Sequence, residues 1–397
     1  MRLLTVFPST LRGGAEEYAL TIDRAAREHG WDVHAAFPYT EDTTTLVRDF
    51  QDSGIAYHSL AINEKSSYPY ELSRWHHWLC FSRSLRCLLA VRPTVVHLVL
   101  PLPYYGLGVM LACSVLNIPT AVVFQLVPGR VDVGAKMLRA YHWSKSRRQE
   151  WIAISRENHR HLCASFGIKE EDVHVIYNGS SLTELDATPV DRLRREIRRE
   201  LGLNEDDRIL LTVGRLNFQK GYLDLAAVIP QILDAFPDVT FVWVGEGGQR
   251  AQLEKVIRES GVANKVRLLG YRRDVPRLLR AADLFVFPTH FEGGQSFAVS
   301  EAMAAGLPIV SSDASGIPEV IDSGVHGVLY PVRDRTALAG ALRWALLNPM
   351  SMRTMGQNAV ARARDFSAEQ MCKRTLSILN NLGMKRCGAR TSRLARV

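Results

Sequence analysis

Two carboxylates flank a glycine loop in the second half of the chain: Glu292 precedes Gly293 and Gly294, and Glu301 follows them. The apolar run before the loop stops at Pro288, which favours a buried parallel strand because proline cannot continue the ladder. A strand, a glycine loop and a helix N-terminus in this order present free backbone amides that bind phosphate. The pattern therefore predicts a nucleotide-activated substrate whose hydroxyl groups are held by the two acids.

Two cations follow another buried strand, which we expect at 209–213. Arg215 and Lys220 both come after its carboxyl end, where open α/β sheets bind their ligands. A guanidinium and an ammonium group together can neutralise a diphosphate as it leaves. The alternative, two surface cations beside a helix start, agrees less well with the spacing and the strand context.

Apolar runs and helical patterns alternate along the chain, as they do in α/β folds with parallel sheets. After the glycine loop, Ser296 is expected to cap a helix that runs through Ala305 and stops at Gly306. Strands are expected at 3–7, 31–37, 55–60, 95–100, 119–125, 150–155, 173–177, 209–213, 240–244, 266–269, 284–287 and 308–312. A helix at 74–90 carries aromatic and histidine side chains that we expect in the core, namely Trp75, His76, His77, Trp78 and Phe81.

The composition is that of a soluble globular protein, with 47% apolar and 23% charged residues among 397. This length suffices for two domains. The six cysteines show no C-x-x-C spacing, which favours reduced thiols in a cytoplasm, and the N-terminus is typical of a strand rather than a signal peptide. The uncharged stretch 93–129 imitates a membrane span, but Pro101, Pro103 and Pro119 divide it into segments too short to cross a bilayer.

The glycine loop and the helix after it resemble the signature of family 4 of the GT-B glycosyltransferases, also called glycosyl transferases group 1. Those enzymes transfer sugar from a nucleotide sugar with retention of configuration. Their signature has two glutamates with seven residues between them, followed by Ala-x-Ala-x-Gly-x-Pro. The second half matches here as Glu301-Ala302-Met303-Ala304-Ala305-Gly306-Leu307-Pro308. Eight residues separate Glu292 from Glu301, so either the loop carries one extra residue as a bulge or Glu292 does not occupy the place of the first glutamate. The two glycines favour the bulge, because they absorb an insertion at little steric cost.

The resemblance implies roles for the residues of the second domain. Glu301 would hold the ribose hydroxyls, and Glu292 would hold the donor sugar and favour charge at the anomeric carbon. Arg215 and Lys220, which resemble the family's Gly-Arg…Lys-Gly element, would stabilise the departing diphosphate. The remaining candidates are the loop residues around the distal phosphate and residues near the base, namely Gly293, Gly294, Gln295, Ser296, Phe297, Gly245, Tyr271 and Arg272.

The first domain offers weaker candidates. Gly13 and Gly14 resemble a family loop near the donor diphosphate and the acceptor, with a tight structural turn as the alternative. His97 resembles a histidine of the family's Asp-Val-Val-His element, although a lone histidine on an apolar strand is more often structural. Gln125 stands where many relatives have a histidine near the donor sugar, and it can still donate a hydrogen bond.

The resemblance implies an α/β protein of GT-B architecture with two Rossmann-like domains facing a cleft. The expected parts are an acceptor-side domain at 1–182, a linker and helix at 183–206, a nucleotide-sugar-binding domain at 207–366, a helix crossing back at 367–384 and a basic tail at 385–397. The implied activity is retaining transfer of a hexose from a UDP- or GDP-sugar to a glycan or lipid-linked acceptor, in cell-surface polysaccharide or glycolipid synthesis. An epimerase of the same fold and a catalytically silent GT-B binding or scaffold protein are the alternatives. No Asp-x-Asp occurs, so we expect neither a metal nor another cofactor.

The formal charge of +8 is unevenly distributed. The stretch 130–160 carries eight basic residues and interleaved aromatics, Tyr141, Trp143 and Trp151, and the tail adds five basic residues with no acid. Such stretches suit an anionic membrane surface, a polyanionic acceptor or nucleic acid, or are simply solvated helix faces. Nucleic acid is not expected, because no nucleic-acid-binding signature accompanies them. We therefore expect a cytoplasmic protein that can associate peripherally with the membrane.

Overall fold

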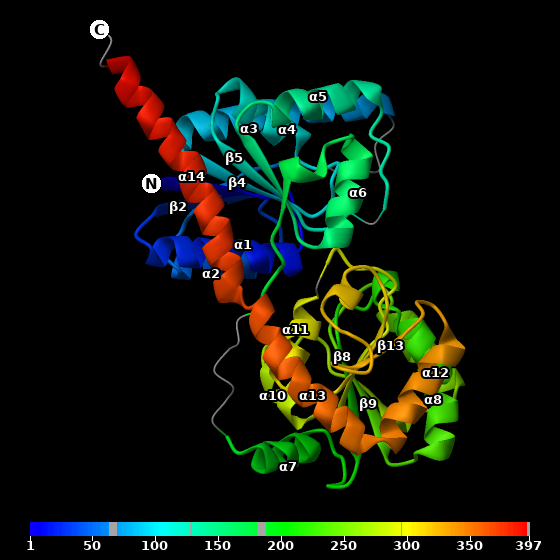
Figure 1. Cartoon of the computed structure of the whole chain (residues 1–397). Helices are drawn as coiled ribbons and strands as arrows, with labels where there is room; N and C mark the ends of the chain where they lie inside the picture. The colour runs from blue at the N-terminus through cyan, green and yellow to red at the C-terminus, as the bar shows by residue number, and fades with distance from the viewer. Residues whose placement is uncertain (63–69, 128, 181–187, 295, 395–397) are drawn as a thin grey trace. The chain divides into compact units, whose positions relative to one another are not determined.

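The computed structural model describes residues 1–62, 70–127, 129–180, 188–294 and 296–394, with the backbone alone described at 70–76 and 385–394. These residues form two compact units. The first comprises Met1–Asn178 together with the C-terminal helix from Glu369, and the second comprises Gly179–Ala368. Each unit is built around one parallel sheet (Figure 1).

The first unit has a seven-stranded sheet in the order β3-β2-β1-β4-β5-β6-β7. Its strands are apolar and mostly buried, as strands covered by helices on both faces must be. Helices α3, α4 and α5 lie on one side of the sheet and α1 and α2 on the other (Figure 1). The elements are β1 (Arg2–Val6), α1 (Gly14–Glu28), β2 (Asp32–Phe37), α2 (Thr44–Asp52), β3 (Ala56–Ser59), α3 (Tyr70–Val91), β4 (Val95–Leu100), α4 (Leu107–Val115), β5 (Thr120–Phe124), α5 (Ala135–Lys145), β6 (Gln149–Ala153), α6 (Arg156–Phe166), η1 (Glu170–Asp172), β7 (Val173–Val175) and α14 (Ala368–Leu394).

The second unit has a six-stranded sheet in the order β10-β9-β8-β11-β12-β13. The chain runs outward from β8 to β10 and then returns to the other side of β8, so the strand order reverses between β8 and β11. Such a switch point is where open α/β sheets bind ligands. The elements are α7 (Val190–Glu200), β8 (Arg208–Val213), η2 (Phe218–Lys220), α8 (Tyr222–Ala235), β9 (Val239–Val244), α9 (Arg250–Glu259), η3 (Ala263–Lys265), β10 (Val266–Leu268), α10 (Val275–Ala281), β11 (Leu284–Phe287), α11 (Phe297–Ala304), β12 (Ile309–Ser312), η4 (Ile317–Glu319), β13 (Val328–Tyr330), α12 (Arg335–Leu347), α13 (Pro349–Ala363) and η5 (Arg364–Phe366).

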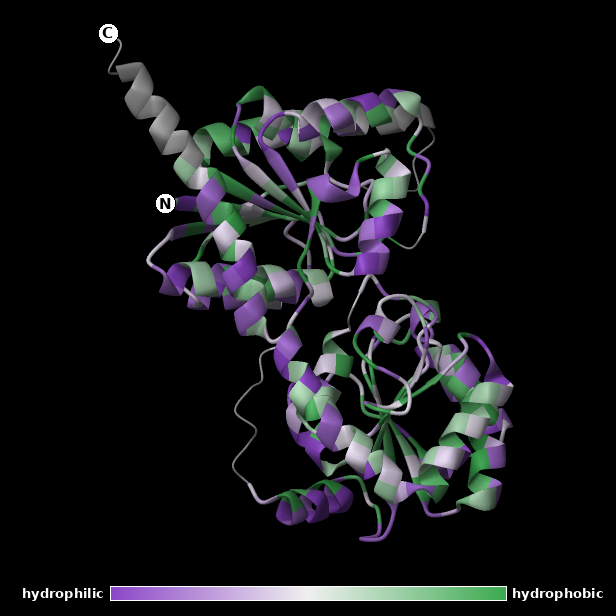
Figure 2. Cartoon of the chain, viewed as in Figure 1, coloured by the Kyte–Doolittle hydropathy of each residue, from purple (hydrophilic) through white to green (hydrophobic). Residues whose placement is uncertain are grey.

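The predicted α/β architecture with parallel sheets is confirmed, and every predicted strand is present with its ends shifted by at most a few residues. Figure 2 shows the reason, since hydrophobic strands occupy the centre of each unit. The limits assigned to the domains stay predictions. The helix at the C-terminus is longer than expected, because α14 continues to Leu394 through most of the segment that we interpreted as a separate tail.

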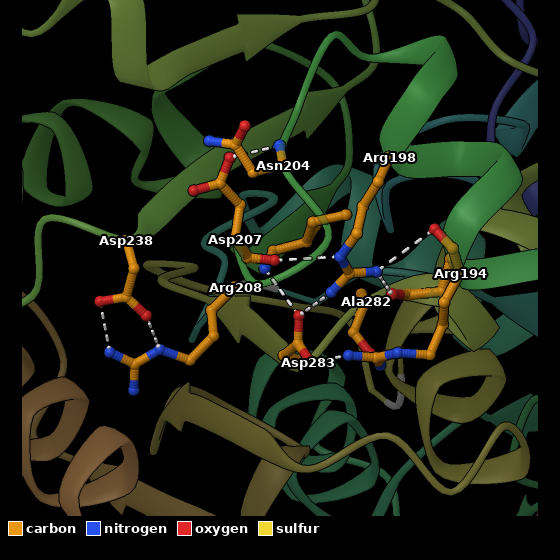
Figure 3. Close-up of polar contacts among 10 residues, drawn as sticks. Arg194, Arg198, Asn204, Asp207, Arg208, Asp238, Ala282 and Asp283 are labelled. Carbon is orange, nitrogen blue, oxygen red and sulfur yellow. Dashed lines mark hydrogen bonds and ion pairs between the residues drawn. The ribbon is translucent and has the colours of Figure 1, made fainter. Parts of the chain in front are cut away.

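Helix α7 occupies the stretch that we expected to link the domains, and it is bound to the second unit (Figure 3). Arg198 is buried and donates to Asp283 Oδ2 at 2.8 Å and to the Asp207 carbonyl at 3.1 Å. Arg194 pairs with the same Asp283 carboxylate, which also accepts the backbone N–H of Ile209 at 2.8 Å. One carboxylate therefore joins α7 to the beginnings of β8 and β11.

Two expectations about aromatic side chains were wrong. Tyr141 and Trp151 of the basic stretch 130–160 are fully buried in the core and cannot anchor the chain to a surface. Trp78, which we expected in the core, is 67% exposed on α3. Trp75 and His76 lie outside the residues whose side chains are described. In the described residues, no helix is both long and apolar enough to span a membrane.

Candidate functional site

Two loops at the switch point of the second unit are held together by hydrogen bonds. One contains η2 after β8, and the other is the 288–292 segment after β11. The N–H of His290 donates to the Gln219 carbonyl at 2.7 Å, and the Gln219 side chain donates back to the Phe291 carbonyl at 3.0 Å. The Thr289 hydroxyl oxygen lies 3.0 Å from the Gln219 carbonyl oxygen. These contacts fix the loops at the carboxyl ends of neighbouring strands.

Lys220 and Glu292 meet within this pair of loops. Lys220 Nζ lies 2.5 Å from Glu292 Oε1, and the Thr289 hydroxyl donates to the same oxygen at 2.7 Å. The two charged side chains are only 12% and 9% exposed, so each charge needs the other as compensation. The backbone N–H of Glu292 donates to the Ser315 hydroxyl at 3.0 Å, which holds the backbone of the loop at this residue. The site thus holds one cation and one anion side by side with little solvent between them.

Gly221 allows the two loops to approach this closely. Its φ of +67° lies in the left-handed region, and a Cβ there would come within 1.8 Å of the Pro288 carbonyl oxygen. A glycine is therefore required at this position for both conformational and steric reasons.

A second polar network supports the same loop from the other side. His290 Nε2 lies 2.7 Å from Asp224 Oδ2, and Arg335 Nε donates to Asp224 Oδ1 at 2.7 Å. Burial raises the pKa of Asp224, but the hydrogen bonds and charges of Arg335 and His290 outweigh it and hold that pKa below its ordinary value. Asp224 is therefore an anion that holds the 288–292 segment against α8.

The glycine loop leads into α11. Gly294 is buried, and Ser296 precedes the helix, which begins at Phe297 and ends before Gly306 with its φ of +68°. These helix ends confirm the prediction, although the Ser296 hydroxyl does not cap the N-terminus in the described structure. Glu301 lies on α11 and is partly exposed. Gln295 lies outside the described residues, so the bulge stays a prediction.

The other candidates of the second unit have different surroundings. Arg215 is exposed, and its side chain makes no hydrogen bond or ion pair in the described part of the chain. Gly245 is needed for packing, because a Cβ there would lie 2.0 Å from the Gly214 carbonyl oxygen. Tyr271 is 65% exposed. Arg272 is paired with Asp274 and Glu200, which raise its pKa, so its guanidinium already serves a structural cluster.

The candidates of the first unit lie on different elements. Gly13 precedes α1 and Gly14 begins it. His97 is completely buried on β4, with Nδ1 3.4 Å from the Thr5 hydroxyl and its ring against Tyr18. Burial lowers the pKa of His97 to about 3, which favours the structural alternative of a neutral core histidine.

Gln125 lies at the end of β5 and is buried against Asn178, which follows β7. Asn178 Nδ2 donates to Gln125 Oε1 at 3.0 Å. Gln125 Nε2 and Asn178 Oδ1 have no partner among the described residues. The pair therefore keeps one donor and one acceptor available at the carboxyl edge of the first sheet.

Several of these residues were not predicted from the sequence, namely Thr289, Ser315, Asp224, His290 and Asn178. They act through contacts between segments that are far apart along the chain, such as Asp224 of α8 with His290. Only the position of Thr289 and His290 beside Glu292 could have drawn attention to them.

Comparison with known proteins agrees with this geometry. Residues 194–362 match the family model described as glycosyl transferases group 1, and residues 12–184 match that of Glycosyltransferase Family 4. An uncharacterized glycosyltransferase of Methanocaldococcus jannaschii is 35% identical over 183 residues, 45% of this chain and 46% of that protein. A D-inositol 3-phosphate glycosyltransferase of Corynebacterium kroppenstedtii is 29% identical over 232 residues, 55% of this chain and 51% of that protein. The matches thus span about half the length of these curated relatives.

Solved structures share the fold over nearly the whole chain. A glycosyltransferase of Rickettsia africae superposes with a TM-score of 0.80 at 17% identity, covering 96% of this chain and 98% of that one. HepE of Anabaena, solved in complex with UDP-glucose, superposes with a TM-score of 0.77 at 20% identity, covering 96% and 100%. The chain therefore has the GT-B fold. The second half resembles the group 1 glycosyltransferases and the first half resembles Glycosyltransferase Family 4, as the sequence predicted.

Proposed function

We propose that this chain is a retaining glycosyltransferase of the hexosyltransferase type. It would move a sugar from a UDP- or GDP-sugar to a glycan or lipid-linked acceptor in cell-surface polysaccharide or glycolipid synthesis. The observation that carries this proposal is the buried Lys220–Glu292 pair, held at the switch point of the second sheet beside a glycine loop. The UDP-glucose bound by HepE supports a uridine donor.

The donor would be bound by the second unit. Glu301 holds the ribose hydroxyls, and the amides of the glycine loop and of the N-terminus of α11 receive the distal phosphate. Arg215, whose side chain has no competing ion pair in the described structure, is available to the diphosphate. Lys220 supplies the second positive charge as the leaving group develops its negative charge.

Glu292 would act on the sugar. Its carboxylate accepts hydrogen bonds from Lys220 and Thr289 through Oε1. The carboxylate is thus held in one orientation, in which Oε2 can accept from a donor hydroxyl. A negative charge fixed in a site with little solvent stabilises positive charge at the anomeric carbon.

Whether the transfer inverts or retains the anomeric configuration depends on whether the protein supplies a base for the acceptor. An inverting transfer needs a base that deprotonates the acceptor as it attacks from the far face. His97, the candidate imidazole of the first unit, is neutral and fully buried, and Gln125 cannot act as a base. In a retaining transfer the departing phosphate can take the proton on the same face, with the protein supplying orientation and charge stabilisation.

An acceptor assay with NMR of the product tests this proposal. From an α-linked UDP- or GDP-sugar we expect an α-linked product, seen in the coupling of its anomeric proton. A β-linked product would contradict the retaining mechanism. Turnover of the donor in the absence of any acceptor, with release of an isomeric nucleotide sugar, would instead support an epimerase.

We further expect transfer to be independent of divalent metal. Arg215 and Lys220 would neutralise the diphosphate in place of a cation. Activity measured in EDTA should equal activity measured in buffer. A complete loss in EDTA that manganese restores would contradict this assignment of the two cations.

A lipid-linked acceptor would bring the enzyme to the membrane. We propose that the protein works at the cytoplasmic face and associates peripherally with anionic lipid. Basic residues near such a surface contribute about 1 kcal/mol each to binding.

A further inference from the structure

Helix α3 presents two apolar faces, of which one belongs to the core. Cys80, Ser84 and Leu88 are almost completely buried on that face. The helix also packs closely on α4, since a Cβ at Gly108 would lie 2.8 Å from the backbone nitrogen of Phe81. Phe81, Leu85 and Cys87 are partly buried against the same core.

The opposite side of α3 exposes large apolar side chains. Trp78 is 67% exposed, Leu79 is 50% exposed and Leu89 is 55% exposed. At about 100° per residue these three positions fall within one third of the helix circumference. A solvated helix face is ordinarily polar, so this exposure needs an explanation.

Positive charge accompanies the exposed apolar side chains. Arg83 and Arg86 are exposed on the same side of α3 and have no ion pair in the described part of the chain, although Arg83 Nη1 donates to the Ala61 carbonyl at 2.7 Å. No aspartate or glutamate occurs from 72 to 131, a stretch that includes most of α3 and all of α4. The cations of this side therefore lack nearby anions along the chain.

We propose that the α3 face, formed by Trp78, Leu79, Arg83, Arg86 and Leu89, docks on an anionic lipid surface. Apolar and indole side chains enter the interface between headgroups and acyl chains, and arginines between them attract anionic headgroups. This inference rests on the proposed function for its purpose, which is access to a lipid-linked acceptor. It places the main membrane contact on α3, because Tyr141 and Trp151 of the 130–160 stretch belong to the core and Trp143 is only 38% exposed.

The combination of side chains favours lipid over other polyanions. Nucleic acids are bound mainly through phosphate contacts and base stacking, for which exposed leucines serve no purpose. A polyanionic glycan likewise has no apolar layer to receive Leu79 and Leu89. Among these polyanions, only a membrane interface receives the apolar and the basic members of this face together.

Flotation of the full chain with vesicles tests the proposal. The wild type should float with phosphatidylglycerol vesicles at low salt, remain behind with pure phosphatidylcholine vesicles, and be released by salt. Arg83→Glu/Arg86→Glu should lower the fraction bound at least about tenfold, because each cation contributes to binding and each new carboxylate opposes it. Trp78→Ser/Leu79→Ser should weaken binding while leaving the charge unchanged.

A matched control separates this face from net charge. Arg258 and Arg353 are exposed on α9 and α13 of the second unit, so Arg258→Glu/Arg353→Glu changes the net charge equally and should float like the wild type. Unchanged flotation of Arg83→Glu/Arg86→Glu would overturn the proposal. So would a wild type that is retained on immobilised RNA but does not float with phosphatidylglycerol vesicles. Each variant is also melted with and without nucleotide sugar, so that failure of the α3 face and failure of the proposed function are told apart.

Discussion

Glu292→Gln is expected to lower kcat by about 10²–10³-fold, the usual effect of removing one preorganised electrostatic contact to a transition state. Glutamine keeps an oxygen that accepts from Lys220 and Thr289, but it leaves the buried Lys220 cation without its anion, so the variant should also have a lower melting temperature. The negative charge near the anomeric carbon is lost. Steady-state kinetics with nucleotide titration should therefore show a fall in kcat with little change in nucleotide affinity.

Glu301→Ala provides the contrasting variant. The Glu301 carboxylate is assigned to the ribose, so its loss should weaken nucleotide binding itself and raise KM for the donor. An inert Glu292→Gln change would mean that the extra residue of the glycine loop places another group at the sugar.

Arg215→Ala is expected to lower kcat by a similar factor without changing the melting temperature. Its side chain is exposed and makes no hydrogen bond or ion pair in the described structure, so its removal should alter stability by no more than about 0.5 kcal/mol. The positive charge that stabilises the leaving diphosphate would nevertheless be lost.

Lys220→Ala should reduce both activity and stability. It leaves the Glu292 carboxylate buried without its cation, and breaking such a pair costs about 3–5 kcal/mol. Melting curves recorded beside the kinetics would show that Arg215→Ala lowers activity alone, whereas Lys220→Ala lowers both activity and stability. A destabilised Arg215→Ala, or a Lys220→Ala chain as stable as the wild type, would contradict the pairing described here.

The sequence predicted the fold well because buried parallel strands have a strong signal. The run Leu284–Phe287 is apolar, ends at proline and forms β11 with the predicted bounds. Helix α3 is an element for which the sequence pattern does not predict which side is buried. Its apolar residues cover both of its sides, and periodicity alone does not tell which side faces the core, so Trp78 was placed inside. For Tyr141 and Trp151 the error was the opposite, since we expected them at the surface and they are buried. Charged neighbours along the chain do not show what packs on an aromatic ring.

The site was predicted in part. Lys220 and Glu292 both follow strands, and the structure shows these strands to be neighbours, β8 and β11, which is why the two side chains meet. The contacts that orient them were not predictable. Thr289, Ser315 and the Asp224–His290 pair depend on side-chain geometry between loops, for which no spacing rule exists. The family resemblance named candidates such as Tyr271, Arg272 and His97 by position alone, and their surroundings differ from those of the Lys220–Glu292 pair.

The most direct test of donor use is thermal unfolding of the wild type with a panel of UDP- and GDP-sugars in the presence of EDTA. A ligand that binds only the folded chain stabilises it by about 2.7 kcal/mol at a hundredfold excess over its Kd. We predict that at least one nucleotide sugar raises the melting temperature in a concentration-dependent way, and that Glu301→Ala reduces the rise. If no nucleotide sugar and no nucleoside diphosphate changes the melting temperature of the wild type, the chain does not bind such donors and the proposed glycosyl transfer is contradicted.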